Sequence, residues 1–419
     1  MNAANASGEL RRRVWRWHFL AAFLVVPFVL WQSLTGTLYV WSEAYVDARH
    51  PQLRFVPVGE SKTSLDEQAA AARAVAGGRR LTDIALPADP ARSTMFAFED
   101  GAVPRVIFVD PYSARRLGEL RGVDWTPGWT RKLHGGWPLG DPGSWLLELG
   151  ACWTIVMVLT GVYLWWPRDG RSIGQVLVPR WRAGGRLRWR DLHACVAVWF
   201  SLITVLFLLT ALPWTSFWGG RVLQPLQQAL RQSGPTAAGF APVFAGSGGA
   251  AASLQQLLDE ARTRSLDGDL TLSLVDGPPG SAVAVRTRRN KASERRYLLL
   301  DRADGATLGY ADWRDFPLLA KTVATGVDIH EARFFGSAGP WLNTAFAGAL
   351  VWMSVTGFMT WWRRKPERAL GVPPAARAPW PAWLKAFGAA LFVALPLLAL
   401  SVSLLWLAEK AWLRAANAR

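Results

Sequence analysis

The sequence predicts an α-helical polytopic membrane protein, with an internally duplicated four-helix transmembrane core, a fifth helix and two α+β modules outside the membrane. Of the 419 residues, 51% are hydrophobic and 25 are tryptophans. The hydrophobic residues gather in runs close to the roughly 20 residues that cross a bilayer. Tryptophans stand at most run ends, as in interfacial aromatic belts. Matched patterns around four histidines then relate the two halves of the chain.

Five apolar runs are candidate transmembrane helices: 19–41, 145–166, 194–214, 341–362 and 387–407. The first run follows several arginines, as the core of a signal peptide would. It is too long for such a core, and TGTLYVWSEAY is a poor cleavage site, so we expect a retained helix.

Clusters of basic residues predict the orientation of these helices. They precede the first run, separate the second from the third and follow the fourth. Their members are Arg11, Arg12, Arg13, Arg16, Arg168, Arg171, Arg180, Arg182, Arg186, Arg188, Arg190, Arg363, Arg364, Lys365 and Arg368. By the positive-inside rule these segments face the cytoplasm, so the net charge of +16 requires no nucleic-acid partner. The fifth helix would then end outside, against the preference of Lys410 and Arg414.

Each of the two long polar segments predicts a small α+β module. A helical stretch (TSLDEQAAAARAVAG, SLQQLLDEARTRSL) precedes strand-like runs, which are STMFAFED and PRVIFVD in the first segment and LTLSLVD, SAVAVRT and RRYLLLD in the second. The expected order is an N-terminus with helix 1 (1–41), module 1 (42–133), the helix 2 unit (134–166), a basic loop (167–192), helix 3 (193–214), module 2 (215–329), the helix 4 unit (330–362), and a basic loop with helix 5 (363–419).

Histidines define the internal repeat. HGGWPLGDPGSWL from His134 and HEARFFGSAGPWL from His330 share the pattern H-x5-G-x2-G-x-W-L, and each histidine precedes a threonine by 26 residues. His18 and His193 likewise each precede a threonine by 17 residues. The fifth histidine, His50 in DARHPQL, has no repeat partner and is expected at the surface.

The predicted topology pairs these histidines by membrane face. His18 and His193 start helices that run outward, so both lie at the cytoplasmic edge. His134 and His330 precede helices that run inward, so both lie at the outer edge. Each face therefore has one histidine from each repeat, and neutral imidazole is a good ligand for iron, copper and zinc. Polar interface residues inherited by duplication would give the same pattern, and that alternative stays open.

Paired histidines that face each other across a helix bundle commonly hold b-type haem. A bare metal with two imidazoles would be under-coordinated, whereas haem supplies four ligands of its own. Asp191 and Asp328 each precede a paired histidine by two residues and are candidate acceptors for its non-ligating ring nitrogen.

Glycines and arginines could complete such sites. Gly36, Gly161 and Gly357 would allow close helix or porphyrin approach. Breaks after the outer histidines would turn each histidine segment over the bundle, or form ordinary caps. These breaks contain Gly140, Pro142, Gly143, Gly336, Gly339 and Pro340, and arginines that could meet propionates are Arg13, Arg16, Arg131, Arg188 and Arg333. For any single arginine, a topogenic or solvated role is the alternative.

Other cofactor motifs are missing from the sequence. Cys152 and Cys195 fall inside predicted helices and outside any CxxCH motif, which excludes covalent c-type haem attachment. No GxGxxG between a strand and a helix and no GxxxxGK[ST] occurs, so the chain has no evident nucleotide or flavin domain.

Together with the histidine units, the stretches LTGVYLWWPR, RDLHACVAVW, LTALPWTSFWG and VTGFMTWWRRKP resemble the PepSY-associated transmembrane family over residues 10–367. Its members are described as iron-regulated or ferrisiderophore-reductase-like inner-membrane proteins. The resemblance implies that the outer segments are PepSY-type modules, with the endings DPYSARRLG and DRADGATLG. It also implies two b-type haems, whose iron would have His18, His193, His134 and His330 as axial ligands.

The implied activity is that of a transmembrane oxidoreductase in the bacterial inner membrane. Electrons from a cytoplasmic or quinol donor would reach the haem of His18/His193, pass to the haem of His134/His330, and reduce a periplasmic Fe(III)-siderophore or another acceptor. Hard siderophore oxygens hold Fe(III) far better than Fe(II), so one electron loosens the complex.

Three rival functions differ in class. A coupled transporter usually buries carboxylates or lysines in mid-membrane, and the four core runs contain only Glu148. A haem-free PepSY membrane protein that binds or regulates a peptidase would not need paired imidazoles at both faces. A haem protein linked to quinol or a flavoprotein would share the predicted haem ligands and differ in its partner.

Overall fold

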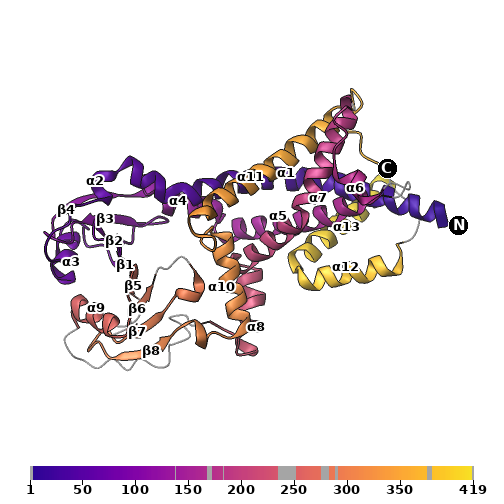
Figure 1. The fold of residues 1–419 in the computed structure, drawn as a ribbon. Helices are drawn as coiled ribbons and strands as arrows, with labels where there is room; N and C mark the ends of the chain where they lie inside the picture. Colours follow the sequence, from indigo (N-terminus) through magenta and orange to yellow (C-terminus); the bar gives the residue numbers. More distant parts are fainter. Residues whose placement is uncertain are drawn as a thin grey trace. The chain divides into compact units, whose positions relative to one another are not determined.

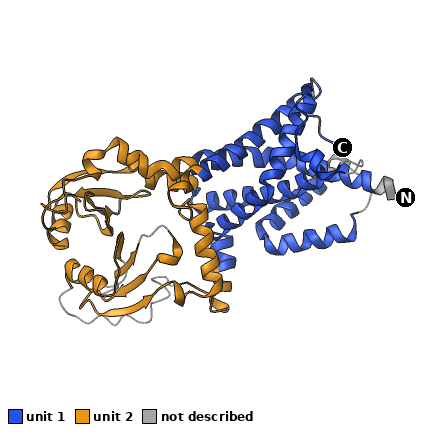
Figure 2. Ribbon diagram, in the orientation of Figure 1, with its two compact units in different colours: residues 1–36, 135–223, 342–419 blue, residues 37–134, 224–341 orange. Residues whose placement is uncertain are grey.

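In the computed structural model, the described residues are 3–136, 138–167, 172–182, 184–234, 252–274, 283–287, 291–374 and 380–417. They form two compact units (Figure 2). The helical unit comprises residues 1–36, 135–223 and 342–419, and the sheet unit comprises residues 37–134 and 224–341. Arg168 and Arg171 of the predicted basic loop lie outside the described residues.

Among the described residues, four helices are long and apolar enough to cross a membrane, and they correspond to the first four predicted runs. They are α1 (Ala3–Arg49), α5 (Asp141–Trp165), α7 (Gly185–Ala211) and α11 (Gly339–Trp362). At about 1.5 Å per residue, the 25 residues of α5 exceed a hydrocarbon core of about 30 Å. The chain is therefore a polytopic membrane protein.

The predicted fifth helix, 387–407, is broken in the structure, although the two pieces together are long and apolar enough for one span. The structure has two helices here, α12 (Ala382–Ala394) and α13 (Pro396–Asn417), with a bend of 119° between them. Pro396 has no N–H, and its ring clashes with the preceding helical turn, so α12 ends before it. Leu395 and Leu398 at the bend are buried in the same hydrophobic cluster as Cys152 of α5.

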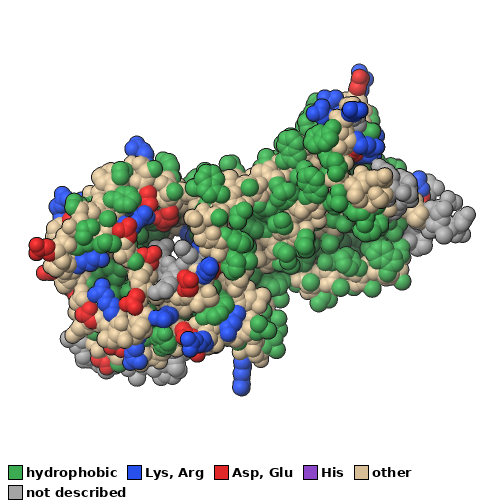
Figure 3. Space-filling view, in the orientation of Figure 1, with side chains coloured by type: hydrophobic (Ala, Val, Ile, Leu, Met, Phe, Trp, Pro, Cys, Tyr) green, Lys and Arg blue, Asp and Glu red, His purple; other side chains and the backbone are tan. Residues whose placement is uncertain are grey.

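The helical unit also contains short elements between its long helices. These are α6 (Ile173–Leu177), η2 (Leu212–Trp214) and η3 (Trp218–Leu223). In the space-filling view, hydrophobic side chains dominate the visible face of this unit, whereas charged side chains of both signs are frequent over the sheet unit (Figure 3). An apolar surface of this kind suits contact with lipid.

Eight antiparallel strands form a single sheet with the order β4-β3-β2-β1-β5-β6-β7-β8 (Figure 1). The strands are β1 (Leu81–Leu86), β2 (Thr94–Phe98), β3 (Arg105–Val109), β4 (Arg116–Leu120), β5 (Leu270–Leu274), β6 (Val283–Thr287), β7 (Tyr297–Leu300) and β8 (Thr307–Ala311). The five strand-like runs of the sequence correspond to β2, β3, β5, β6 and β7. The other three strands are short segments with polar residues or glycine, which gives them a weak strand pattern.

The two halves of the sheet join where β1 pairs with β5. Ile84 lies opposite Leu272, and both side chains are fully buried. The Ser273 hydroxyl donates to Asp83 Oδ1 at 2.6 Å across the same junction. Helices α3 (Leu65–Arg73) and α9 (Leu254–Thr263) contribute to one hydrophobic cluster with strands of both halves. The two predicted modules thus share one core.

Shorter helices complete the sheet unit. They are α2 (Pro51–Arg54), η1 (Gly122–Asp124), α4 (Thr126–His134), α8 (Gln224–Ala229), η4 (Ala292–Glu294), η5 (Trp313–Asp315), α10 (Leu318–His330) and η6 (Gly336–Ala338). The order of a helix, four strands, a 3-10 turn and a histidine-ended helix occurs once in each half.

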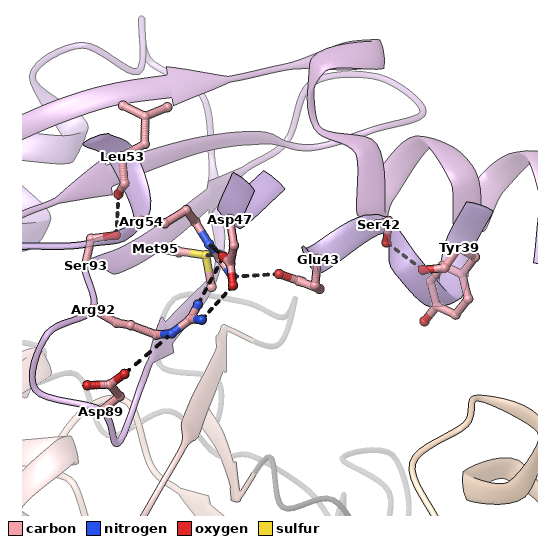
Figure 4. Close-up of polar contacts among 10 residues, drawn as sticks. All are labelled: Tyr39, Ser42, Glu43, Asp47, Leu53, Arg54, Asp89, Arg92, Ser93 and Met95. Carbon is pink, nitrogen blue, oxygen red and sulfur yellow. Dashed lines mark hydrogen bonds and ion pairs between the residues drawn. The ribbon is translucent and has the colours of Figure 1, made fainter. Parts of the chain in front are cut away.

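An ion-pair network ties the C-terminal end of α1 to the sheet (Figure 4). The buried Arg54 guanidinium donates to Glu43 at 2.7 Å and to Asp47 at 2.6 Å. Arg92 donates to the other Asp47 oxygen at 2.6 Å. Because Arg54 also contacts Met95 of β2, this one side chain links helix and sheet.

We expect Arg54→Ala to destabilise the protein by about 2–3 kcal/mol, since it leaves charged partners without their hydrogen bonds. Arg79→Ala is the matched control, because both members of its ion pair with Asp100 are at least partly exposed, and the pair should contribute less than about 1 kcal/mol. Thermal unfolding in detergent measures the difference. Equal effects of the two changes would contradict the structural role of Arg54.

Candidate functional site

The structure places His18 of α1 beside His193 of α7 in the helical unit. The centres of the two imidazole rings are 6.5 Å apart, and the ring planes are inclined at 70°. Both side chains are partly buried. One histidine from each predicted repeat therefore contributes to this pair, which we call the helical-unit pair.

In each ring of the helical-unit pair, Nδ1 is hydrogen-bonded to a neighbouring helix. His18 Nδ1 lies 3.1 Å from the Met157 carbonyl oxygen of α5, and His193 Nδ1 lies 3.0 Å from the Met353 carbonyl oxygen of α11. A carbonyl oxygen can only accept, which assigns the proton to Nδ1. Nε2 then keeps its lone pair and is the nitrogen that can bind a metal.

The repeated Thr-Gly dipeptides explain how the rings reach these carbonyls. Gly161 stands four residues after Met157, where a side chain would lean over that carbonyl. A methyl group on Gly161 would lie 3.2 Å from His18 Cε1, and one on Gly357 would lie equally close to His193 Cε1. The missing side chains therefore make room for the imidazoles.

The threonines of these dipeptides contact the same nitrogens. Thr160 Oγ1 lies 3.1 Å from His18 Nδ1, and Thr356 Oγ1 lies 3.5 Å from His193 Nδ1. Each hydroxyl also donates to a carbonyl of its own helix, so its oxygen remains available as an acceptor. In the sequence repeat, Thr160 and Thr356 lie 26 residues after His134 and His330. Their contact with the Nδ1 atoms of His18 and His193 was not predicted.

The structure also places His134 beside His330, with ring centres 6.3 Å apart and ring planes inclined at 45°. We call them the sheet-unit pair. His134 is the last residue of α4, and His330 is the last residue of α10. These two helices were not predicted from the sequence, where each histidine was grouped in one unit with the helix that follows it.

Tight turns separate these histidines from the next helices. After His134, the backbone at Gly136 has φ of +105°, and a methyl group on Gly143 would lie 2.0 Å from the Gly136 carbonyl oxygen. After His330, Ala332 has φ of +64°, and a methyl group on Gly339 would meet the Ala332 carbonyl. These glycines are required by close backbone contact.

The surroundings of His134 favour the neutral form of its imidazole. Burial of its ring, together with the nearby His330, lowers the pKa of His134 to about 3. At neutral pH the imidazole is therefore uncharged, and the uncharged form is the one that can coordinate a metal.

The prediction that Asp191 and Asp328 accept hydrogen bonds from histidines is wrong. Asp191 forms a bidentate ion pair with Arg180 and a further one with Arg190. The fully buried Asp328 carboxylate instead accepts from a backbone N–H and two guanidinium groups, which belong to Ala292, Arg295 and Arg333. The negatively charged aspartates bind guanidinium groups, which are stronger donors than a neutral imidazole. Main-chain carbonyls accept the hydrogen bonds from His18 and His193 instead.

The candidate propionate arginines divide into two groups. Arg13 stacks over Trp380, Arg16 donates to the Pro373 carbonyl, and Arg333 pairs with Asp328 and Glu331. Arg131 and Arg188 are exposed. Among the contacts of the described residues, only these last two have no stacking, ion-pair or hydrogen-bond partner.

The donor set fits haem better than a bare metal. Across the described residues, no group of three or more His, Cys, Asp or Glu side chains is arranged to hold a metal ion. Each pair instead offers two imidazoles. Metal–nitrogen bonds of about 2 Å, with roughly 1 Å from each nitrogen to its ring centre, put the centres about 6 Å apart. The spacings of 6.5 and 6.3 Å agree with this value.

The remaining histidine, His50, precedes α2 and caps it without a side-chain hydrogen bond. It is partly exposed. No contact with another histidine is described for it, so we assign it no ligand role.

Glu148 forms a second buried polar cluster in the helical unit. Its side chain is fully buried, and Oε2 accepts the Trp218 N–H at 2.9 Å. Ser144 accepts the Ser216 N–H at 3.0 Å one turn earlier, and the Trp218 indole donates to the Ala394 carbonyl beside the α12–α13 bend. The carboxylate thus orders the segment that follows α7.

We expect Glu148→Leu to destabilise the protein by about 1–3 kcal/mol, since the main-chain N–H of Trp218 loses its acceptor. Glu148→Gln keeps an acceptor oxygen and should cost less. Thermal unfolding of both variants in detergent provides the comparison. If Gln and Leu were equally destabilising, the hydrogen bond to Trp218 would not be the reason for the buried carboxylate.

Comparison with known proteins bears on most of the chain. A search of curated proteins found no match. The family model described as the PepSY-associated TM region matches residues 15–364, a span that contains both histidine pairs. The chain therefore belongs to the PepSY-associated transmembrane family.

Proposed function

We propose that the protein is a b-type di-haem electron-transfer protein of the bacterial inner membrane. It would reduce Fe(III)-siderophore, or another periplasmic acceptor, with electrons from the cytoplasmic side or the quinol pool. The observation that carries the proposal is the arrangement of four of the five histidines as two imidazole pairs with ring centres 6.5 and 6.3 Å apart. Bound haem would supply reversible one-electron transfer at each pair.

The chain's own residues prepare the imidazoles for this role. In the helical-unit pair, the carbonyl groups of Met157 and Met353 hold the Nδ1 protons and fix both rings. This hydrogen bond sets the tautomer and raises the basicity of Nε2. In the sheet-unit pair, the lowered pKa of His134 keeps its imidazole neutral.

The proposed orientation rests on the distribution of basic residues. Arginines flank His18 and His193 in the sequence, which assigns that pair to the cytoplasmic side. The sheet unit, with His134 and His330, would then face the periplasm. Its exposed charged surface (Figure 3) suits a water-soluble acceptor.

The visible absorption spectrum of the detergent-purified protein tests the proposal, with haem quantified per chain. We expect about two haems per chain and a sharp α-band after reduction by dithionite, as six-coordinate bis-histidine haem gives. A colourless protein, expressed with adequate haem, would contradict the proposal. It would favour a haem-free PepSY protein that binds or regulates a peptidase.

Single histidine changes test the pairing. We expect His134→Ala or His330→Ala to remove one haem per chain and leave the spectrum of the helical-unit pair intact. His18→Ala and His193→Ala should remove the other haem, and His50→Ala should remove neither. Loss of both haems from one substitution, in protein that remains folded by circular dichroism, would contradict the assignment of ligands.

Gly357→Ala tests the fit between α11 and the imidazole of His193. The added methyl would lie 3.2 Å from Cε1 and 3.3 Å from Nδ1, so the ring must shift by a few tenths of an ångström. We expect altered electron paramagnetic resonance g-values for one haem. Gly348→Ala, on the same helix with nothing within 4 Å of the added methyl, should leave both signals unchanged.

A further inference from the structure

The sheet unit contains a cavity of about 500 Å³ near the junction between the two halves of the sheet. The segment before α3, helix α9 and residues next to β1 and β5 border it. Its polar lining includes Lys62, Gln68, Arg92, Gln255 and Arg262. Small-molecule sites typically occupy about 300–1,000 Å³, so the size suits a compact ligand.

Two cations line this cavity without a strong acidic partner. Among the described residues, Lys62 forms no ion pair or hydrogen bond. Arg262 has one ion pair, with Asp259 one turn earlier, at 3.8 Å between two exposed side chains. Exposed pairs of this kind contribute little. The acidic group on the lining is Asp267, so positive charge predominates.

The two cations are close enough to affect each other. Partial burial of the ammonium and the nearby Arg262 guanidinium lower the pKa of Lys62 below its ordinary value. Lys62 and Arg262 are exposed side chains on the same lining, and an anion bound between them would reduce the repulsion of their like charges.

A third cation is fixed at the cavity wall. Arg92 donates to both oxygens of Asp47, at 3.2 and 2.6 Å, and lies near Asp89 (Figure 4). These contacts hold the guanidinium in place and neutralise much of its charge. Arg92 therefore contributes shape and hydrogen-bond donors, whereas Lys62 and Arg262 contribute the charge that remains available.

The lining also offers a buried acceptor. Gln68 is 3% exposed, and its Nε2 donates to the Thr63 carbonyl at 3.0 Å. Its Oε1 is buried and has no hydrogen-bond partner in the described structure. A buried amide oxygen without a partner is costly, and an O–H donor of a ligand would satisfy it.

We propose that this cavity binds the Fe(III) chelate of a small hydroxycarboxylate. Carboxylate oxygens that do not bind the iron would meet Lys62 and Arg262, and an iron-bound water of the chelate would donate to Gln68 Oε1. Arg262 can bind a carboxylate through two parallel hydrogen bonds. This inference rests on the proposed function, because it assigns hydroxycarboxylate chelates as the acceptor class.

Binding of Ga(III)–citrate to the full-length protein in detergent tests the inference. Ga(III) has the charge of Fe(III) but is not reduced, so calorimetry measures binding without electron transfer. We expect saturable binding, weakened at least tenfold in Lys62→Met and in Arg262→Gln. Arg264→Gln is the matched control, because Arg264 is outside the lining of the cavity and pairs with Glu260 at 3.1 Å.

Several outcomes would overturn the inference. These are no binding, binding that all three variants retain, and citrate or inorganic phosphate binding more tightly than the chelate. Haem content of the same samples separates this result from the proposed function. Chelate binding to a haem-free protein would refute electron transfer and keep the cavity as a binding site, whereas haem without chelate binding would refute the site alone.

Discussion

The helical-unit pair depends on one physical requirement: an imidazole must reach a main-chain carbonyl that already belongs to a helix. A carbonyl oxygen has two lone pairs, so Met157 and Met353 can each accept from a histidine Nδ1 as well as within their helices. The side chain four residues later would cover that carbonyl. Glycine at this position, with threonine just before it, is the solution found on both α5 and α11.

This requirement explains why main-chain groups, and not carboxylates, orient His18 and His193. A carboxylate in a membrane-spanning segment is costly unless it is paired. Asp191 is instead committed to Arg180 and Arg190. The neutral carbonyl fixes the same tautomer without bringing charge to the pair. Helices α1, α5, α7 and α11 must therefore pack in a defined register for the two rings to meet.

The sheet unit meets a different constraint. Each predicted module alone would have an unpaired edge at its first strand, and unpaired edges invite aggregation. Pairing of β1 with β5 removes both edges and places Ile84 and Leu272 in one core. Because the two halves share one core, the segment before α3 and the residues of and after α9 lie side by side. The basic cavity lies between them. After the last strand of each half, a helix ends at the histidine of the sheet-unit pair.

The sequence alone determined the four long apolar helices, five of the eight strands, and the four histidines at matched spacings, because these features depend on composition and local periodicity. It also singled out Gly161 and Gly357, for the approach of a helix or porphyrin and not of the imidazoles that lie there. The partners of Asp191 and Asp328, the bend at Pro396 and the pairing of β1 with β5 were decided by tertiary structure. Hydrogen-bond partners distant in sequence leave no periodic signal, and proline in a membrane helix is often tolerated, so only packing shows where the chain turns.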